Sequence, residues 1–205
     1  MKVRLKILPD KPRGSAWRSS ARGVNCSVKS GKRTSDAMTR KLKLDPDTCY
    51  MLGMYSCSMR SPISITTTND EVVKKFAGIA LKLGVEPNKM RIESGKEGLI
   101  KAFFYHSKLE KMFRSTLERR SIVFSHKNAR ALSYIAGIFD SNGGKDRFGL
   151  YIKGLDPANA VIMENLGFHV WESGGRYYIL NAKVFITLIA GYSVMLSYEQ
   201  HSSAR

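Results

Sequence analysis

Residues 132–144 read LSYIAGIFDSNGG, and this stretch decides the fold that we expect for the chain. An apolar run with Ala136 and Gly137 at its centre precedes a short polar end with two glycines. This pattern is typical of a closely packed helix that stops at a loop. Residues 50–58, YMLGMYSCS, repeat the aromatic residue, the apolar pair and the glycine. Gly137 follows Gly53 by 84 residues, and the two stretches therefore predict an internal duplication.

The elements predicted after the two stretches follow the same order in both copies. The first copy predicts a helix over 46–58, a strand over 63–67, a helix over 69–83, a hairpin of strands over 89–93 and 99–105, and a helix over 107–119. The second predicts a helix over 128–141, a strand over 148–153, a helix over 157–166, a hairpin of strands over 168–172 and 176–180, and a helix over 182–195. Each copy leaves room for one strand between its first helix and its second.

Residues 135–143, IAGIFDSNG, resemble the LAGLIDADG motif, and the order of elements resembles the LAGLIDADG homing endonuclease-like family, with both copies in one chain. The resemblance covers roughly residues 46–195 and is clearer in the second copy. It implies an α+β fold of two pseudo-symmetric repeats whose mixed or antiparallel half-sheets pack on helices. It also implies that the motif helices meet at the repeat interface of a monomer with an internal pseudo-twofold axis. Small residues there, Gly53, Ala136 and Gly137, let the helices approach.

Catalysis in this family depends on an acidic residue at the eighth position of each motif, and the two carboxylates hold divalent metal over the scissile phosphates. Here those positions are Ser58 and Asn142, and neither supplies the anionic oxygen that hard cations prefer. Asp140 lies two positions earlier, where we expect it to make hydrogen bonds at the helix end or at the edge of the core. We therefore expect no catalytic residue, no metal site and no cofactor, and a chain that is not an enzyme.

The charge of the chain points to a polyanionic partner. The 205 residues hold 34 Lys and Arg against 17 Asp and Glu, a formal net charge of +17. This excess is larger than solubility requires and is typical of proteins that bind nucleic acid, although a solvated basic surface is the alternative. The apolar content of 43% is enough to form a core.

The first 45 residues are expected to form a basic arm that begins with a short strand over residues 3–7. They hold 13 basic and 3 acidic residues, with much Ser and Gly and one Trp, too few apolar residues to form a core. Tryptophan among arginines can stack on bases while the arginines neutralise phosphates. A tail without function is the alternative. The nucleic-acid-binding residues that we expect in the arm are Arg4, Lys6, Arg13, Trp17, Arg18, Arg22, Lys32 and Arg33.

The outward faces of the predicted strands carry basic and aromatic side chains in alternation, which suits phosphate neutralisation together with stacking on unpaired bases. Ordinary solvated strands with half-buried aromatic residues are the alternative. The binding residues that we expect there are Lys89, Arg91, Lys101, Tyr105, Arg147, Tyr151, Lys153, Arg176 and Tyr178.

We expect the partner to be structured RNA, including ribosomal RNA in a ribosome-bound setting, because the arm resembles the extensions of ribosomal proteins. The alternatives are a DNA-binding transcription regulator derived from a homing endonuclease and a residual DNA endonuclease. Three cysteines without metal-ligand spacing, and no apolar run long enough for a membrane span, predict a cytoplasmic protein without a membrane partner. The expected divisions are an arm over 1–45, repeats over 46–122 and 123–195, and a tail over 196–205.

Overall fold

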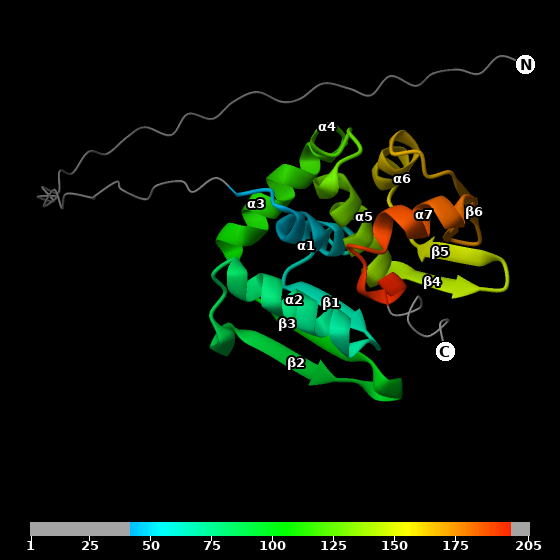
Figure 1. Cartoon of the computed structure of the whole chain (residues 1–205). Helices are drawn as coiled ribbons and strands as arrows, with labels where there is room; N and C mark the ends of the chain where they lie inside the picture. The colour runs from blue at the N-terminus through cyan, green and yellow to red at the C-terminus, as the bar shows by residue number, and fades with distance from the viewer. Residues whose placement is uncertain (1–41, 198–205) are drawn as a thin grey trace, which may run out of the picture. The chain divides into compact units, whose positions relative to one another are not determined.

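The computed structural model describes residues 42–197 (Figure 1), so the predicted arm and its eight binding residues lie outside the described part of the chain. The first repeat contains α1 (Pro46–Ser56), β1 (Ile63–Thr67), α2 (Asp70–Lys82), η1 (Pro87–Lys89), β2 (Met90–Ser94), η2 (Lys96–Gly98), β3 (Ile100–Phe104), α3 (Ser107–Glu118) and α4 (Arg120–Val123). The second contains α5 (Ala129–Asn142), β4 (Gly143–Asp146), β5 (Gly149–Lys153), α6 (Pro157–Asn165), β6 (Val170–Ser173), β7 (Arg176–Ile179) and α7 (Ala182–Ile189). The predicted α+β fold with two half-sheets is confirmed.

Helices α1 and α5 form the centre of the fold, and their sequences explain where they begin. Asp45 caps α1 by accepting a hydrogen bond from the Thr48 N–H at 2.8 Å, and Pro46 occupies the first helical turn. Asn128 caps α5 in the same way, accepting from the Arg130 and Ala131 N–H groups. Both helices are buried on all sides over most of their length, so each lacks a solvent face.

The two central helices touch through backbone atoms at their glycines. A Cβ atom at Gly53 would lie 2.0 Å from the Tyr134 carbonyl oxygen, and one at Gly137 would lie 2.0 Å from the Tyr50 carbonyl oxygen. Each tyrosine stands three residues before the glycine of its own helix, so the contact is the same in both directions. Ala136 is fully buried in the same helix. The duplication in the sequence thus corresponds to a pseudo-symmetric crossing of the two helices. Only glycine fits at its centre, where Gly53 and Gly137 lie.

The first sheet has the strand order β1-β3-β2, with both neighbouring pairs antiparallel. Figure 1 shows α2 lying over this sheet, and the ring of Phe76 from α2 packs on Phe104 from β3 with centroids 5.6 Å apart. Because Ile63, Ile65 and Phe104 face the helices, the alternate residues of each strand face the other way.

Within residues 42–197, no helix is long and apolar enough to span a membrane.

The second sheet has the order β4-β5-β7-β6, and the prediction of a single strand between the helices of each copy is wrong here. Gly143 and Gly144 were expected to end the helix in a loop, but they begin β4, which pairs with β5. A Cβ atom at Gly143 would lie 2.4 Å from the Phe139 carbonyl oxygen, and one at Gly144 would lie 2.6 Å from the Tyr151 hydroxyl oxygen. A side chain at either glycine would clash, so the glycines allow β4 to follow α5 without a loop. In the sequence, two glycines after a helix indicate only that the helix ends, and not whether a loop or a strand follows.

The last predicted helix, residues 182–195, is also shorter than expected. Helix α7 ends at Ile189, and residues 194–197 form a separate helical turn. The Asp140 carboxylate accepts hydrogen bonds from the Val194 N–H at 2.7 Å and the Met195 N–H at 3.3 Å. Asp140 of α5 thus caps the first turn of a new helix. The predicted helix is interrupted because this cap comes from a residue more than fifty positions earlier in the chain.

Candidate nucleic-acid interface

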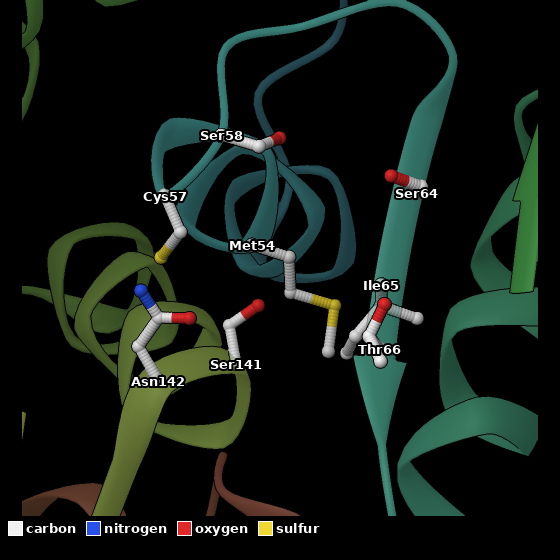
Figure 2. Close-up of a pocket in the computed structure, with 8 residues that line it drawn as sticks. All are labelled: Met54, Cys57, Ser58, Ser64, Ile65, Thr66, Ser141 and Asn142. Atoms are coloured by element: carbon white, nitrogen blue, oxygen red, sulfur yellow. The ribbon is translucent and has the colours of Figure 1, made fainter. Parts of the chain in front are cut away.

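The ends of α1 and α5 lie together, and a hollow opens on each side of them. One, of about 170 Å³, separates the helix ends from β1 and is shown in Figure 2. The other is more open and faces β5. Cys57, Ser141 and Asn142 line both hollows, with Ser64 and Thr66 of β1 on one side and Tyr151 and Lys153 of β5 on the other. Because these strand residues belong to the outward faces of their sheets, both sheet faces border the same helix ends.

The side chains at the helix ends are neutral. Ser58 is exposed, and Asn142 donates a hydrogen bond from its side-chain amide to the Lys153 carbonyl oxygen at 3.2 Å, which ties α5 to β5. Burial raises the pKa of the Cys57 thiol to about 12, so this sulfur stays protonated. The residues lining the two hollows include no carboxylate, and residues 42–197 hold no group of three or more His, Cys, Asp or Glu suited to a metal ion. The donors at this place do not fit the anionic oxygens that divalent magnesium or manganese prefers.

Asp140, in the last turn of α5, is buried and points into the protein. Besides the N–H groups of residues 194 and 195, its oxygens accept from the Tyr50 hydroxyl at 2.6 Å and the Ser193 hydroxyl at 2.5 Å. Desolvation raises the pKa of this carboxyl, and the four hydrogen bonds oppose that shift without cancelling it. The expectation of a hydrogen-bonding role for Asp140 agrees with this geometry.

The pseudo-symmetric place in the other repeat is filled differently. Ser56 corresponds to Asp140 in the motif, so this repeat has no carboxylate at that position. Asn159 of α6 enters instead, accepting from the Tyr134 hydroxyl at 2.8 Å and donating to the Ser56 hydroxyl at 3.4 Å. Tyr50 and Tyr134, which occupy equivalent positions, therefore each have a buried partner. The second of these partners could not be found from the motif alignment, because it comes from another helix.

The outward face of the first sheet carries two rows of residues across the strands. Cross-strand pairing places Ser64, Phe103 and Arg91 in one row and Thr66, Lys101 and Glu93 in the next. The Lys101 ammonium lies 5.1 Å from the centre of the Phe103 ring, and Tyr105, 63% exposed, continues this face beyond the strand. Lys89 was expected here, but it lies in η1 and pairs with Glu86 at 2.9 Å. Of the four expected residues, three share the face and one is held at its edge by an ion pair.

The outward face of the second sheet carries a row of aromatic rings. The register aligns Gly144, Tyr151, Tyr178 and Trp171 across all four strands. Two features were not predicted from the sequence. Tyr178 is only 9% exposed, because neighbouring rings cover it, whereas Trp171 is 56% exposed and Phe148 is 68% exposed. Trp171 can be assigned to this face only from its pairing with Tyr178 of β7. The alternation of residues within β6 does not identify it.

The charged side chains on this second face have different surroundings. Arg176 pairs with Asp146 at 2.7 Å and its guanidinium lies 4.6 Å from the centre of the Tyr151 ring. The Arg147 guanidinium lies 4.6 Å from the centre of the Phe148 ring. Lys153 is exposed beside the more open hollow. Sequence reasoning therefore found the cations of this face, and the structure adds the two most exposed aromatic rings to them.

Solved structures of a homing endonuclease, I-DmoI, share the fold of this chain. Its complex with DNA and calcium matches with a TM-score of 0.59 at 16% identity, over 78% of this chain and 100% of that chain. The chain has the LAGLIDADG homing endonuclease fold. A structure of mesophilic I-DmoI variants gives a TM-score of 0.54 at 18% identity, over 72% of this chain and 97% of the other. A complex of an I-DmoI variant with nicked target DNA and manganese gives a TM-score of 0.52 at 19% identity, over 73% of this chain and 98% of the other.

No protein-family model and no curated protein sequence matches the chain. The likeness to I-DmoI is therefore one of fold, and it is recognisable in three dimensions at an identity below 20%. Within the LAGLIDADG fold, the duplicated stretches of the sequence are the two motif helices.

The prediction that the chain is not an enzyme is contradicted by these comparisons. It rested on the expectation, from the resemblance alone, that Ser58 and Asn142 replace the acidic residues of the motif. The three solved structures reported above are of an endonuclease, and one of them is a complex with nicked target DNA and manganese. Two neutral residues at the helix ends are therefore not sufficient ground for classing the chain as a protein without catalytic activity.

Proposed function

We propose that the chain binds nucleic acid across the outward faces of its two sheets, and that its partner is double-stranded DNA. The observation that carries this proposal is the position of the cationic side chains. Arg91 and Lys101 on one face and Arg147 and Lys153 on the other form no ion pair with any residue in 42–197. Both faces border the same helix ends, so one polyanion passing over them would meet cations from both repeats.

Two further observations support a DNA partner. The net charge of +17 would be partly neutralised by phosphates. The solved structures that share the fold include I-DmoI bound to DNA with calcium and to nicked target DNA with manganese. In the proposed complex, the first sheet contacts the sugar-phosphate backbone through Arg91 and Lys101, with the polar Ser64 and Thr66 between these residues and the helix ends.

The test is the salt dependence of binding to a DNA duplex, measured by fluorescence anisotropy with the full chain. Each lost phosphate contact lowers the slope of log K against log salt by about 0.9. We expect Arg91→Gln and Lys153→Gln each to lower the slope by about that amount. Lys74→Gln is the matched control, because Lys74 is equally charged but lies on α2, on the far side of the first sheet, where it pairs with Glu71 at 2.6 Å.

The controls decide between this proposal and a general effect of charge. If Lys74→Gln lowers the slope as much as the two sheet variants do, net charge alone governs binding and the sheet faces are not the site. If all three variants keep the slope of the parent, the proposal is wrong for the sheets and the basic arm becomes the candidate.

Structured RNA is the second candidate, and the exposed rings of Trp171 and Phe148 favour it, because sequence-specific RNA recognition relies on stacking of unpaired bases. A ribosome-bound protein would sediment with ribosomal subunits in a sucrose gradient and leave them after RNase treatment. Competition between an RNA hairpin and the DNA duplex for the purified chain compares the two partners directly. Tighter binding of the hairpin at equal salt would replace DNA by RNA as the proposed partner.

A further inference from the structure

Four aromatic side chains meet on the outward face of the second sheet, and we call them the aromatic platform: Phe148, Tyr151, Trp171 and Tyr178. Tyr178 lies at the centre, with ring centroids 6.0 Å from Tyr151, 6.0 Å from Trp171 and 6.1 Å from Phe148. Of the three rings around it, Trp171 and Phe148 remain more than half exposed. The platform therefore offers ring surface to solvent from residues that neighbouring rings hold in place.

The platform is supported by one carboxylate. Asp146 accepts hydrogen bonds from the Tyr178 hydroxyl at 3.0 Å, from Arg176 at 2.7 Å and from the Phe148 N–H at 2.8 Å. Desolvation raises the pKa of Asp146, but these hydrogen bonds outweigh it and lower the pKa below its usual value. The turn that carries Phe148 and the strand that carries Tyr178 are therefore fixed to each other before any ligand arrives.

The core does not explain the platform. The inward residues of the same strands, Leu150, Ile152 and Ile179, are the ones that join the hydrophobic core. The corresponding row of the first sheet holds Ser64, Phe103 and Arg91, so the same fold is built there with a single ring, only 7% exposed, between a polar and a charged side chain. Large exposed rings at these positions of the second sheet are thus a property of this repeat and not a requirement of the architecture.

Cations surround the platform. The Arg147 guanidinium stacks near Phe148, Arg176 lies over Tyr151, and Lys153 stands exposed at the neighbouring hollow. Aromatic rings that stack on bases, next to cations that follow the backbone, are the combination by which proteins bind single strands. Bases within a duplex present only their edges in the grooves, so ring faces of this kind fit unpaired bases.

We propose that the aromatic platform binds unpaired nucleobases by stacking, so that the second repeat holds a single-stranded segment next to the duplex contacted by the first. This inference rests on the proposed function. Its ligand is a nucleic acid with a junction between paired and unpaired strands, and the stacking chemistry is common to DNA and RNA. Trp171, with the largest exposed ring, is the principal stacking residue.

The test uses the fluorescence of Trp171 in the full chain. The sequence holds two tryptophans, so the contribution of Trp171 is the difference in emission between the parent chain and its Trp171→Phe variant, which keeps Trp17. The probes are a blunt DNA duplex, the same duplex with a single-stranded thymidine extension, and its RNA counterpart with a uridine extension. We expect an extended probe to quench the Trp171 emission, and the blunt duplex to leave it nearly unchanged.

Affinity measurements separate stacking from folding effects. Trp171→Ala should weaken binding of the extended DNA probe by about 5- to 150-fold, the range for loss of one stacked base, and change binding of the blunt duplex by less than about twofold. Trp171→Phe keeps a ring and should retain most of the affinity. Ile122→Ala removes an apolar side chain from α4 that is more exposed than Trp171, at 70%, and is the control. Phe148→Ala should give a smaller loss in the same direction.

Several outcomes would overturn the inference. If Trp171→Ala weakens both probes equally, or if no extended probe changes the emission, the platform does not bind unpaired bases, although the proposed binding of duplex DNA stands. If neither DNA probe binds the parent, the proposed function fails, and the inference survives only if the extended RNA probe quenches Trp171. Stronger quenching by the RNA probe than by the DNA probe supports stacking and identifies RNA as the preferred source of the bases.

Discussion

The crossing of α1 and α5 gives a sharp test of the fold. Gly137→Ala adds one methyl group at the centre of the crossing, where its carbon would lie 2.0 Å from the Tyr50 carbonyl oxygen and 3.1 Å from the Met54 nitrogen. Ordinary contact begins at 3.4 Å, so the added carbon falls about 1.4 Å short. The nearest obstacle is backbone, which cannot turn away as a flexible side chain can. The two helices must therefore separate over the surface that they share.

The expected loss follows from two opposing effects. Overpacking of a tight core costs about 1–3 kcal/mol, and a contact with backbone places this substitution at the upper end of that range. Replacing a helical glycine by alanine contributes about 1 kcal/mol in the other direction. We therefore expect Gly137→Ala to lower the free energy of unfolding by about 2 kcal/mol, which for a chain of this size lowers the melting temperature by about 4–8 °C.

Urea and thermal unfolding followed by circular dichroism measure this loss, and Gly78→Ala is the matched control. Gly78 lies inside α2, and a Cβ atom there would meet nothing within 4 Å. The same substitution should therefore stabilise the protein at Gly78, by about 0.5–1 kcal/mol. Gly53→Ala should cost as much as Gly137→Ala, and the double variant less than their sum, because one separation of the helices relieves both clashes. A Gly137→Ala protein as stable as the parent would refute the crossing.

Two further predictions concern buried groups. Asp140→Asn places an amide against hydrogen-bond donors and should lower the free energy of unfolding by about 2 kcal/mol in urea titrations. Because desolvation raises the pKa of Asp140 in the folded protein, its stabilising contribution is complete below about pH 4 and declines as the pH rises through the raised value, so the loss should be largest in acid. In a Cys26→Ser variant at pH 8, Cys49 should resist a thiol reagent until urea unfolds the chain, because it is fully buried and burial raises its pKa to about 12. Cys57 lines the two hollows and should react slowly rather than not at all, because desolvation raises its pKa to about 12 as well. Equal reactivity with and without urea would contradict this burial, and an Asp140→Asn loss that grows toward neutral pH would contradict the raised pKa.

Local patterns in the sequence were enough to find most elements of the fold. The Asp45-Pro46 start, the alternation over 63–67 and the apolar face of α2 each depend on residues within one or two turns of one another. The spacing of Gly53 and Gly137 also revealed the duplication. The exceptions are β4 and the end of α7, where contacts with Tyr151 and Asp140 override the local signal.

The candidate site was less accessible to sequence reasoning. The cations Arg91, Arg147 and Lys153 could be placed on outward faces because strand alternation has a period of two. Tyr151 and Tyr178 of the aromatic platform were placed there in the same way, but Phe148 and Trp171 were not, since their position depends on how the strands of the second sheet pair. A shift of one residue in register would send Trp171 to the other side of the sheet.

The sequence by itself determined that this chain is a duplicated α+β protein with a helix pair at its centre and a large positive charge. These properties follow from local periodicity, from glycines at repeated positions and from composition. Only the tertiary structure decided that Asp140 caps a helical turn, that Asn159 completes the opposite network, and that four rings form one surface. These contacts join residues that lie far apart in the chain. Folding brings them to about 3 Å for a hydrogen bond or about 6 Å between ring centres, and a local sequence pattern contains no information on such pairs.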